Sequence, residues 1–148
     1  MDSVSVVKDL CDRMALLHNR YDVVFRRTNV PGHLPYIPLA EALAAGLAAD
    51  HPEAAKLARA VVDPADLDRP EFWATPLGRL MFAAGAFRDK AVTQTLAAAV
   101  LGCSRQWVHQ MVVRGLLRTD AGLNPAAREV YAKDVREMLK TKLDSLVK

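Results

Sequence analysis

The sequence is poor in cysteine and shows no pattern of metal-binding side chains. Its 148 residues include two cysteines, Cys11 and Cys103, which lie far apart and form no CxxC pair. Both fall on apolar stripes of expected helices, so we expect them to be buried small hydrophobic residues rather than a disulfide or a metal site. The four histidines show neither HExxH nor clustered spacing. No metal or other cofactor is expected.

Long apolar runs are missing too, and none reaches the roughly 18 residues of a membrane span. The N-terminus carries acids early and lacks the apolar core of a signal peptide. These absences predict a cytoplasmic protein without a membrane partner. The sequence contains no GxGxxG, Walker loop, nucleophile elbow or paired-carboxylate pattern, so we expect no enzyme.

Alanine is abundant, whereas strand-forming residues are scarce outside a few short segments of the sequence. With 51% hydrophobic and 25% charged residues, the composition is that of an ordinary globular protein. We predict a mainly α fold with a multi-helix N-terminal region, a C-terminal helix-turn-helix followed by a short hairpin, and a long terminal helix. The corresponding units are residues 1–87, 88–123 and 124–148.

The first 27 residues repeat apolar side chains in steps of three and four, from Val4 to Phe25. This spacing predicts an amphipathic helix of about three heptads over residues 3–26. Such a helix either packs on the core of its own domain or pairs with a second subunit, and the pattern leaves both open.

Proline organises the next segments. Residues 28–38 contain three prolines, which remove amide donors and predict a loop. Over residues 38–87 we expect short helices, several of which start with a proline at the first helical position. We expect Phe72 and Trp73 to fix one of these turns to the core. The proline starts are His51-Pro52, Asp63-Pro64 and Thr75-Pro76.

Positive charge collects toward the C-terminus. Residues 1–27 carry a net charge of +1 and residues 28–87 a net charge of −3, whereas residues 88–120 carry +3 and residues 121–148 carry +2. No acidic residue occurs between Lys90 and Arg118. This distribution suits a polyanionic partner.

Residues 94–113 fit the steric demands of two short helices that meet at a steep angle. Where the backbones approach only a small side chain fits, and Ala98 stands there. The turn needs a positive φ, which Gly102 supplies. Ser104 is placed to cap the second helix and Thr93 the first. The inner faces are expected to be apolar, through Ala97, Leu101, Cys103, Val108 and Met111.

The second helix has one polar side. On a 3.6-residue period, Arg105, Gln106, His109 and Gln110 face outward, together with Val113, while Trp107, Val108, Met111 and Val112 face inward. Arginine pairs with guanine and glutamine with adenine in the major groove, and Arg114 and Arg118 are placed for phosphate contacts. The expected DNA-binding residues are Thr93, Ser104, Arg105, Gln106, Trp107, His109, Gln110, Arg114 and Arg118.

This stretch resembles the helix-turn-helix of bacterial and phage DNA-binding regulators, and it is most similar to the MerR/excisionase-like type. The likeness covers about 25 of the 148 residues. It is carried by Ala97, Ala98, Leu101, Gly102, Ser104, Val108, Gly115 and Leu117.

In that type a β-hairpin wing would follow, and residues 116–119 with the turn 120–122 fit its first strand. Asn124-Pro125, however, has the form of a helix start. The sequence favours a long helix from Pro125 over a full wing.

We therefore expect a sequence-specific duplex DNA-binding transcriptional regulator at the nucleoid. We expect a repressor that acts as a homodimer through the N-terminal helix, the C-terminal helix or both. One alternative is an architectural DNA-binding protein of the excisionase, partition or nucleoid-associated type. An alternative from another class is a helical adaptor that binds proteins.

Overall fold

Helices make up most of the protein, and two short strands form the only sheet among the described residues. The computed structural model describes residues 3–24, 36–119 and 129–147. The predicted mainly α fold is confirmed. Within these three ranges no helix is long and apolar enough to cross a membrane. The elements are α1 (Ser3–Val24), α2 (Tyr36–Ala48), α3 (Pro52–Val61), α4 (Pro64–Leu67), α5 (Pro70–Ala74), α6 (Pro76–Ala83), β1 (Ala91–Thr93), α7 (Gln94–Leu101), α8 (Arg105–Val113), β2 (Glu129–Tyr131) and α9 (Ala132–Val147).

The three predicted proline starts are confirmed, and each follows a capping side chain. His51 Nδ1 accepts a hydrogen bond from an amide of the first turn of α3, and the Asp63 carboxylate does the same for α4. Thr75 Oγ1 accepts from the Gly78 amide at 3.0 Å and donates to the Phe72 carbonyl at 2.6 Å, so it joins α5 to α6. Each cap satisfies an amide that has no partner within its helix.

The N-terminal helix packs on its own chain. α1 extends over nearly the predicted range, and its Val6 and Leu10 are fully buried where it contacts α2 and α6. Of the two interpretations of its apolar stripe, packing on its own core is therefore observed, and pairing with a second subunit stays a prediction. Of the predicted loop 28–38, residues 28–35 lie outside the described residues, and α2 begins at Tyr36.

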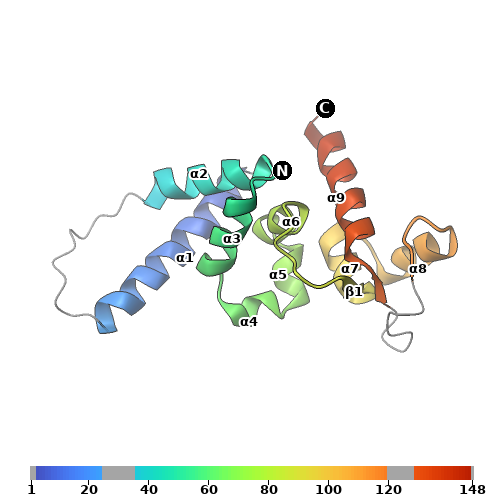
Figure 1. Cartoon of the computed structure of the whole chain (residues 1–148), viewed down its shortest axis with the longest axis horizontal. Coiled ribbons are helices and arrows are strands. Elements are labelled where there is room, and N and C mark those ends of the chain that lie inside the picture. Colours follow the sequence, from blue (N-terminus) through green and yellow to red (C-terminus); the bar gives the residue numbers. More distant parts are fainter. Residues whose placement is uncertain (1–2, 25–35, 120–128, 148) are drawn as a thin grey trace.

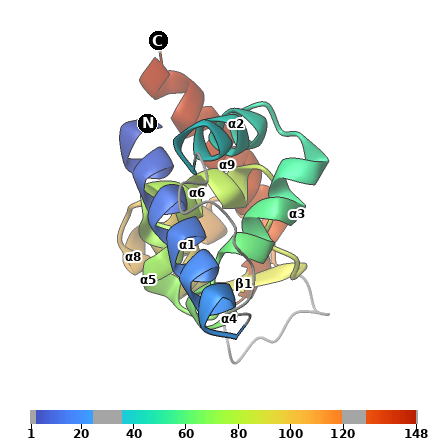
Figure 2. The same ribbon diagram turned by 90° about the vertical axis from the view of Figure 1, so that its left-hand side faces the viewer.

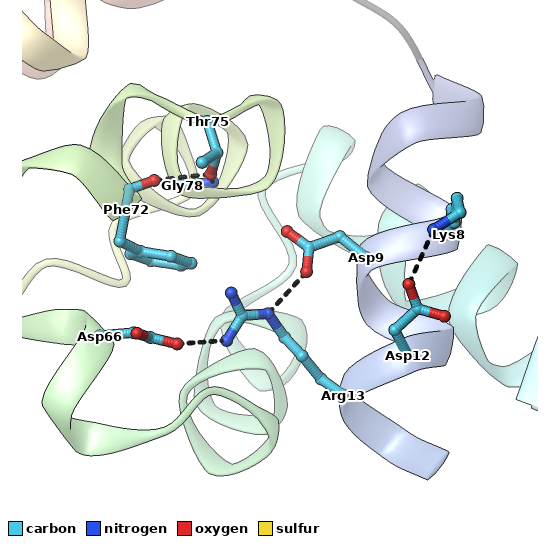
Figure 3. Close-up of polar contacts among 8 residues, drawn as sticks. All are labelled: Lys8, Asp9, Asp12, Arg13, Asp66, Phe72, Thr75 and Gly78. Carbon is cyan, nitrogen blue, oxygen red and sulfur yellow. Dashed lines mark hydrogen bonds and ion pairs between the residues drawn. The ribbon is translucent and has the colours of Figure 1, made fainter. Parts of the chain in front are cut away.

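Arg13 connects α1 to the short helices beside it (Figure 3). Its Nε donates to Asp9 Oδ1 at 2.7 Å and its Nη1 to Asp66 Oδ2 on α4 at 2.8 Å. The guanidinium also lies over the Phe72 ring, 5.1 Å from its centroid. One cation thus joins α1, α4 and α5, an arrangement in which hydrogen bonds and a cation–π contact act together.

An aromatic cluster fills the centre of the molecule. Trp73 meets Phe72, Phe82 and Phe87 edge to face, with ring centroids 5.2, 5.9 and 5.4 Å apart. Its indole N–H donates to the Leu67 carbonyl at 2.9 Å, so the buried polar group has a partner. The prediction that Phe72 and Trp73 fix this turn to the core is confirmed.

One continuous core crosses the predicted boundary between residues 87 and 88. Figure 1 shows α5 and α6 in the middle, with α1 to α3 on one side and α7 to α9 on the other. Figure 2 views the first of these sides, with α1 to α3 in the foreground. α7 packs on α5 and α6, and α9 packs on α6 and α7. Buried side chains from Val6 on α1 to Leu139 on α9 belong to one cluster.

The predicted start of the terminal helix is wrong. Residues 129–131, which that helix was expected to include, form strand β2, and α9 begins at Ala132. β2 pairs antiparallel with β1, with Val92 opposite Val130. The Tyr131 amide also donates to the Arg118 carbonyl at 3.1 Å, so the segment after α8 lies beside β2. The helix start at Asn124-Pro125 lies outside the described residues.

Candidate nucleic-acid interface

The helices α7 and α8 begin and end at the residues that capping side chains and a glycine in the sequence predict. Thr93 Oγ1 accepts from the Leu96 amide at 3.2 Å and caps α7, and Ser104 Oγ accepts from the Trp107 amide at 3.1 Å and caps α8. Between them Gly102 has a φ of 68°. The predicted caps and the predicted positive φ are all confirmed. A turn of three residues therefore separates the two helices.

The inner faces of this helix pair are apolar as predicted, except for the buried Gln94. Val108 and Met111 on α8 lie in the core, and Cys103 in the turn is half-buried. The buried residues of α7 are Gln94, Ala97, Ala98, Val100 and Leu101. Burial of both faces fixes the orientation of α8 relative to α7, because neither helix can rotate without exposing apolar surface.

Two cations from distant elements hold the turn. The Arg79 guanidinium of α6 lies against Gly102, and Lys142 Nζ of α9 donates to the Leu101 carbonyl at 2.5 Å. The C-terminal carbonyls of a helix carry partial negative charge, so a cation there is favourable. Sequence analysis missed both residues, because neither α6 nor α9 shows a local signal for this contact.

The polar side of α8 is open to solvent. Arg105, Gln106, His109 and Gln110 are all exposed, as is Arg114 directly after the helix. These are the side chains predicted to face outward, and the structure brings them together on one helix. The absence of acidic residues from 91 to 117 leaves this face without a carboxylate of its own segment.

Trp107 does not lie where the sequence placed it. It was expected to pack inward beside Met111, but it is 48% exposed. The buried strip of α8 is centred on Val108 and Met111, and at about 100° per residue Trp107 lies at the edge of that strip. α8 packs mainly on α7, and the indole at this edge of the helix remains about half exposed.

Arg118 is engaged within the protein. Its Nε and Nη2 donate to the two carboxylate oxygens of Asp134 at 3.0 and 2.8 Å, and its amide donates to the same carboxylate at 2.9 Å. The Asp134 side chain is almost fully buried, and the hydrogen bonds from Arg118 hold the pKa of its carboxyl below the ordinary value. Arg118 was predicted to contact phosphate, whereas in the structure it joins the segment after α8 to the start of α9.

Other chemistry-bearing side chains are dispersed. Among the described residues, no three histidine, cysteine or acidic side chains cluster as metal ligands would. Cys11 and Cys103 are free, and they are half-buried rather than fully buried as predicted. Burial raises the pKa of both thiols.

Comparison of the chain with protein-family models, with curated proteins and with solved structures finds no match.

Proposed function

We propose that this protein is a sequence-specific duplex DNA-binding transcriptional regulator, with α8 as the helix that enters the major groove. The observation that carries the proposal is the exposed polar side of α8. It combines Arg105, Gln106, His109 and Gln110 on a capped helix whose opposite side is buried. A helix with a fixed inner side presents its outer side chains in one register, which base recognition requires.

The polar side chains of α8 and its ends fall into two groups, those suited to base edges and those suited to phosphate. Arg105 and Gln106 lie in the first turn of α8, where recognition helices contact base edges, and they match guanine and adenine respectively. His109 and Gln110 lie one turn further on. Arg114 follows the helix and is assigned to phosphate. The amides at the N-termini of α7 and α8, near Thr93 and Ser104, suit phosphate oxygens.

We further propose that the protein acts as a homodimer, because two half-sites supply the affinity that a single recognition helix lacks. An open apolar groove of about 1160 Å³ lies between α1, α2, α6 and α9, the two predicted dimerisation helices included. Its lining carries both signs of charge, with Lys8 and Lys140 against Glu41, Asp50 and Asp144. A two-fold interface brings one surface against itself, and mixed charge is compatible with that. Repression would follow from occupancy of the operator at the nucleoid.

Selection of bound sequences from random duplex DNA tests the proposal. We expect enrichment of a two-fold symmetric site with half-sites about one helical turn apart. The matched control is the double variant R105A/Q106A, which retains Ser104 and the buried side of α8 and should enrich nothing in common. Recovery of no shared sequence by the parent chain contradicts sequence-specific binding. An asymmetric site contradicts the symmetric dimer alone.

A second candidate is a protein-binding adaptor. It is favoured by apolar side chains at the surface of the same segment, where Val113 is 74%, Leu116 57% and Trp107 48% exposed. Exposed apolar groups that gather on one element are typical of protein contacts. An adaptor would show no duplex binding in a gel shift with genomic fragments, at protein concentrations where the regulator should shift them.

A further inference from the structure

A basic hollow opens beside the two-stranded sheet, and no residue of α8 belongs to its lining. It has a volume of about 470 Å³ and lies between the loop after α6, the sheet and the start of α9. The charged residues of its lining are four cations and one acid: Lys90, Arg118, Lys133, Arg136 and Asp89. Such an excess of one sign in a concave surface concentrates ions of the opposite sign.

Tyr131 forms the platform of this basic hollow. Lys90 Nζ lies 5.7 Å from the centre of its ring, and the Arg118 guanidinium carbon lies 5.9 Å from it. Each distance is within the range of a cation–π contact. The ring therefore contacts two of the four cations that line the hollow.

The four cations differ in how they are held. Arg136 Nε donates to the Ala83 carbonyl at 2.8 Å, and its guanidinium lies beside Gly85, which has no side chain to cover it. Arg118 is fixed by Asp134, as described above. Lys90 and Lys133 are exposed. Two anchored guanidinium groups with two adaptable ammonium groups match the oxygens of phosphate, which accept several hydrogen bonds at once.

We infer that the basic hollow binds phosphate groups of the DNA backbone that flanks the bases contacted by α8. The inference rests on the proposed function and adds a second point of contact to it. Arg114 and Arg118 are four residues apart, so their Cα atoms are separated by at most about 14 Å. Each DNA strand carries a phosphate about every 3.4 Å along the axis. A strand that passes Arg114 therefore presents several phosphates in the neighbourhood of the hollow.

The experiment is a salt titration of duplex binding by the full chain. The test variant is K90Q/K133Q, which removes the two adaptable cations and leaves Arg118–Asp134 in place. The matched control is K56Q/R69Q, which removes two exposed charges far along the chain, on α3 and before α5. We expect the test variant to bind about tenfold more weakly at moderate salt, with a log–log salt slope reduced by about two. The control should keep both values of the parent, and circular dichroism should show the same melting for all three chains.

The remaining outcomes separate the two levels of the proposal. A test variant with the affinity and salt slope of the parent overturns the phosphate contact and leaves the proposed function intact. A parent chain that binds no duplex overturns both. The phosphate source is tested with inorganic phosphate in calorimetry. The contrary outcome is saturable phosphate binding by the parent chain that the test variant loses while its duplex binding is unchanged. That result would indicate a site for a small phosphorylated molecule and would overturn the backbone contact.

Discussion

The guanidinium of Arg79 lies directly against the backbone of Gly102, although the two residues belong to different helical segments. A Cβ atom built on Gly102 would lie 2.7 Å from Arg79 Nη2, closer than a carbon atom can approach a nitrogen atom to which it is not bonded without displacement. The turn between α7 and α8 is therefore restricted twice, by its left-handed backbone and by the arginine beneath it. The orientation of the polar side of α8 depends on that turn.

Replacement of Gly102 by alanine should destabilise the protein by about 1–3 kcal/mol through its positive φ, with a further cost from displacement of Arg79. Gly115 offers the matched comparison, because its φ is 76° and a Cβ there would meet nothing within 4 Å. Urea unfolding should therefore rank the variants parent, G115A, then G102A in order of falling stability. Equal losses for the two variants would show that Arg79 yields without cost.

The pair Arg118–Asp134 should make stability depend on pH at the acid end. Because Arg118 lowers the pKa of Asp134 from its ordinary value of 3.8, the folded state binds fewer protons there than the unfolded chain. The contribution is complete above that ordinary value and is lost as pH falls through the lower folded value. D134N should cost about 1–2 kcal/mol at neutral pH, and the difference from the parent should shrink in strong acid.

The control for that experiment is D12N, which removes an exposed carboxylate paired with Lys8 on the surface of α1. Exposed pairs of this kind contribute little, so unfolding at neutral and acid pH should distinguish D12N from the parent only weakly. A D134N curve that parallels the parent over the whole range would contradict a stabilising ion pair between Arg118 and the buried Asp134.

Side chains that read bases and side chains that hold the backbone should respond differently to salt. R105A or Q106A should cost about 1–3 kcal/mol on the selected site and relax the preference at one base pair. R114A should weaken selected and scrambled duplexes alike and reduce the salt slope by about one. Titrations on both duplexes at several salt concentrations give both quantities. Equal loss on both duplexes for R105A would mean that α8 is not inserted as proposed.

The two tryptophans should differ in solvent access and in their importance for folding. Trp73 is fully buried with its indole N–H bonded to Leu67, whereas Trp107 is about half exposed. W73F should cost about 1 kcal/mol or more through the lost hydrogen bond and packing, and W107F should change stability by less than about 0.5 kcal/mol. Acrylamide should quench the fluorescence of the W73F chain readily and that of the W107F chain poorly. The reverse pattern would contradict the exposed position of Trp107.

Much of the helix pair could be predicted from the sequence because its determinants are local. A hydroxyl side chain accepts from an amide three residues later, so Thr93 and Ser104 fix the starts of α7 and α8 wherever the chain folds. Gly102 ends α7 because a left-handed residue there has no Cβ to clash. The same holds for the proline starts, where His51, Asp63 and Thr75 each act within one helical turn.

The sheet could not be predicted in this way. β1 and β2 have three residues each, too few to show an alternating pattern, and they lie far apart in the sequence. Their pairing depends on burial of Val92 and Val130 on the same core. The helix-start signal at Asn124-Pro125 is local and carries no information about distant partners. Residues 129–131 form a strand because pairing with β1 and the Tyr131–Arg118 hydrogen bond stabilise it more than a continued helix would.

The sequence by itself determined where the helices of the candidate interface begin and end and which side chains share the polar side of α8, because capping and helical periodicity act over a few residues. Only the tertiary structure decided which charges are held by a partner within the protein. Arg118 and Arg105 look alike in the sequence, yet one faces the buried Asp134 and the other faces solvent. Trp107 is exposed for the related reason that, among the described residues, α8 packs mainly on α7. Contacts with distant segments, made for Arg118 and few for Trp107, set both outcomes, and no spacing within α8 encodes them.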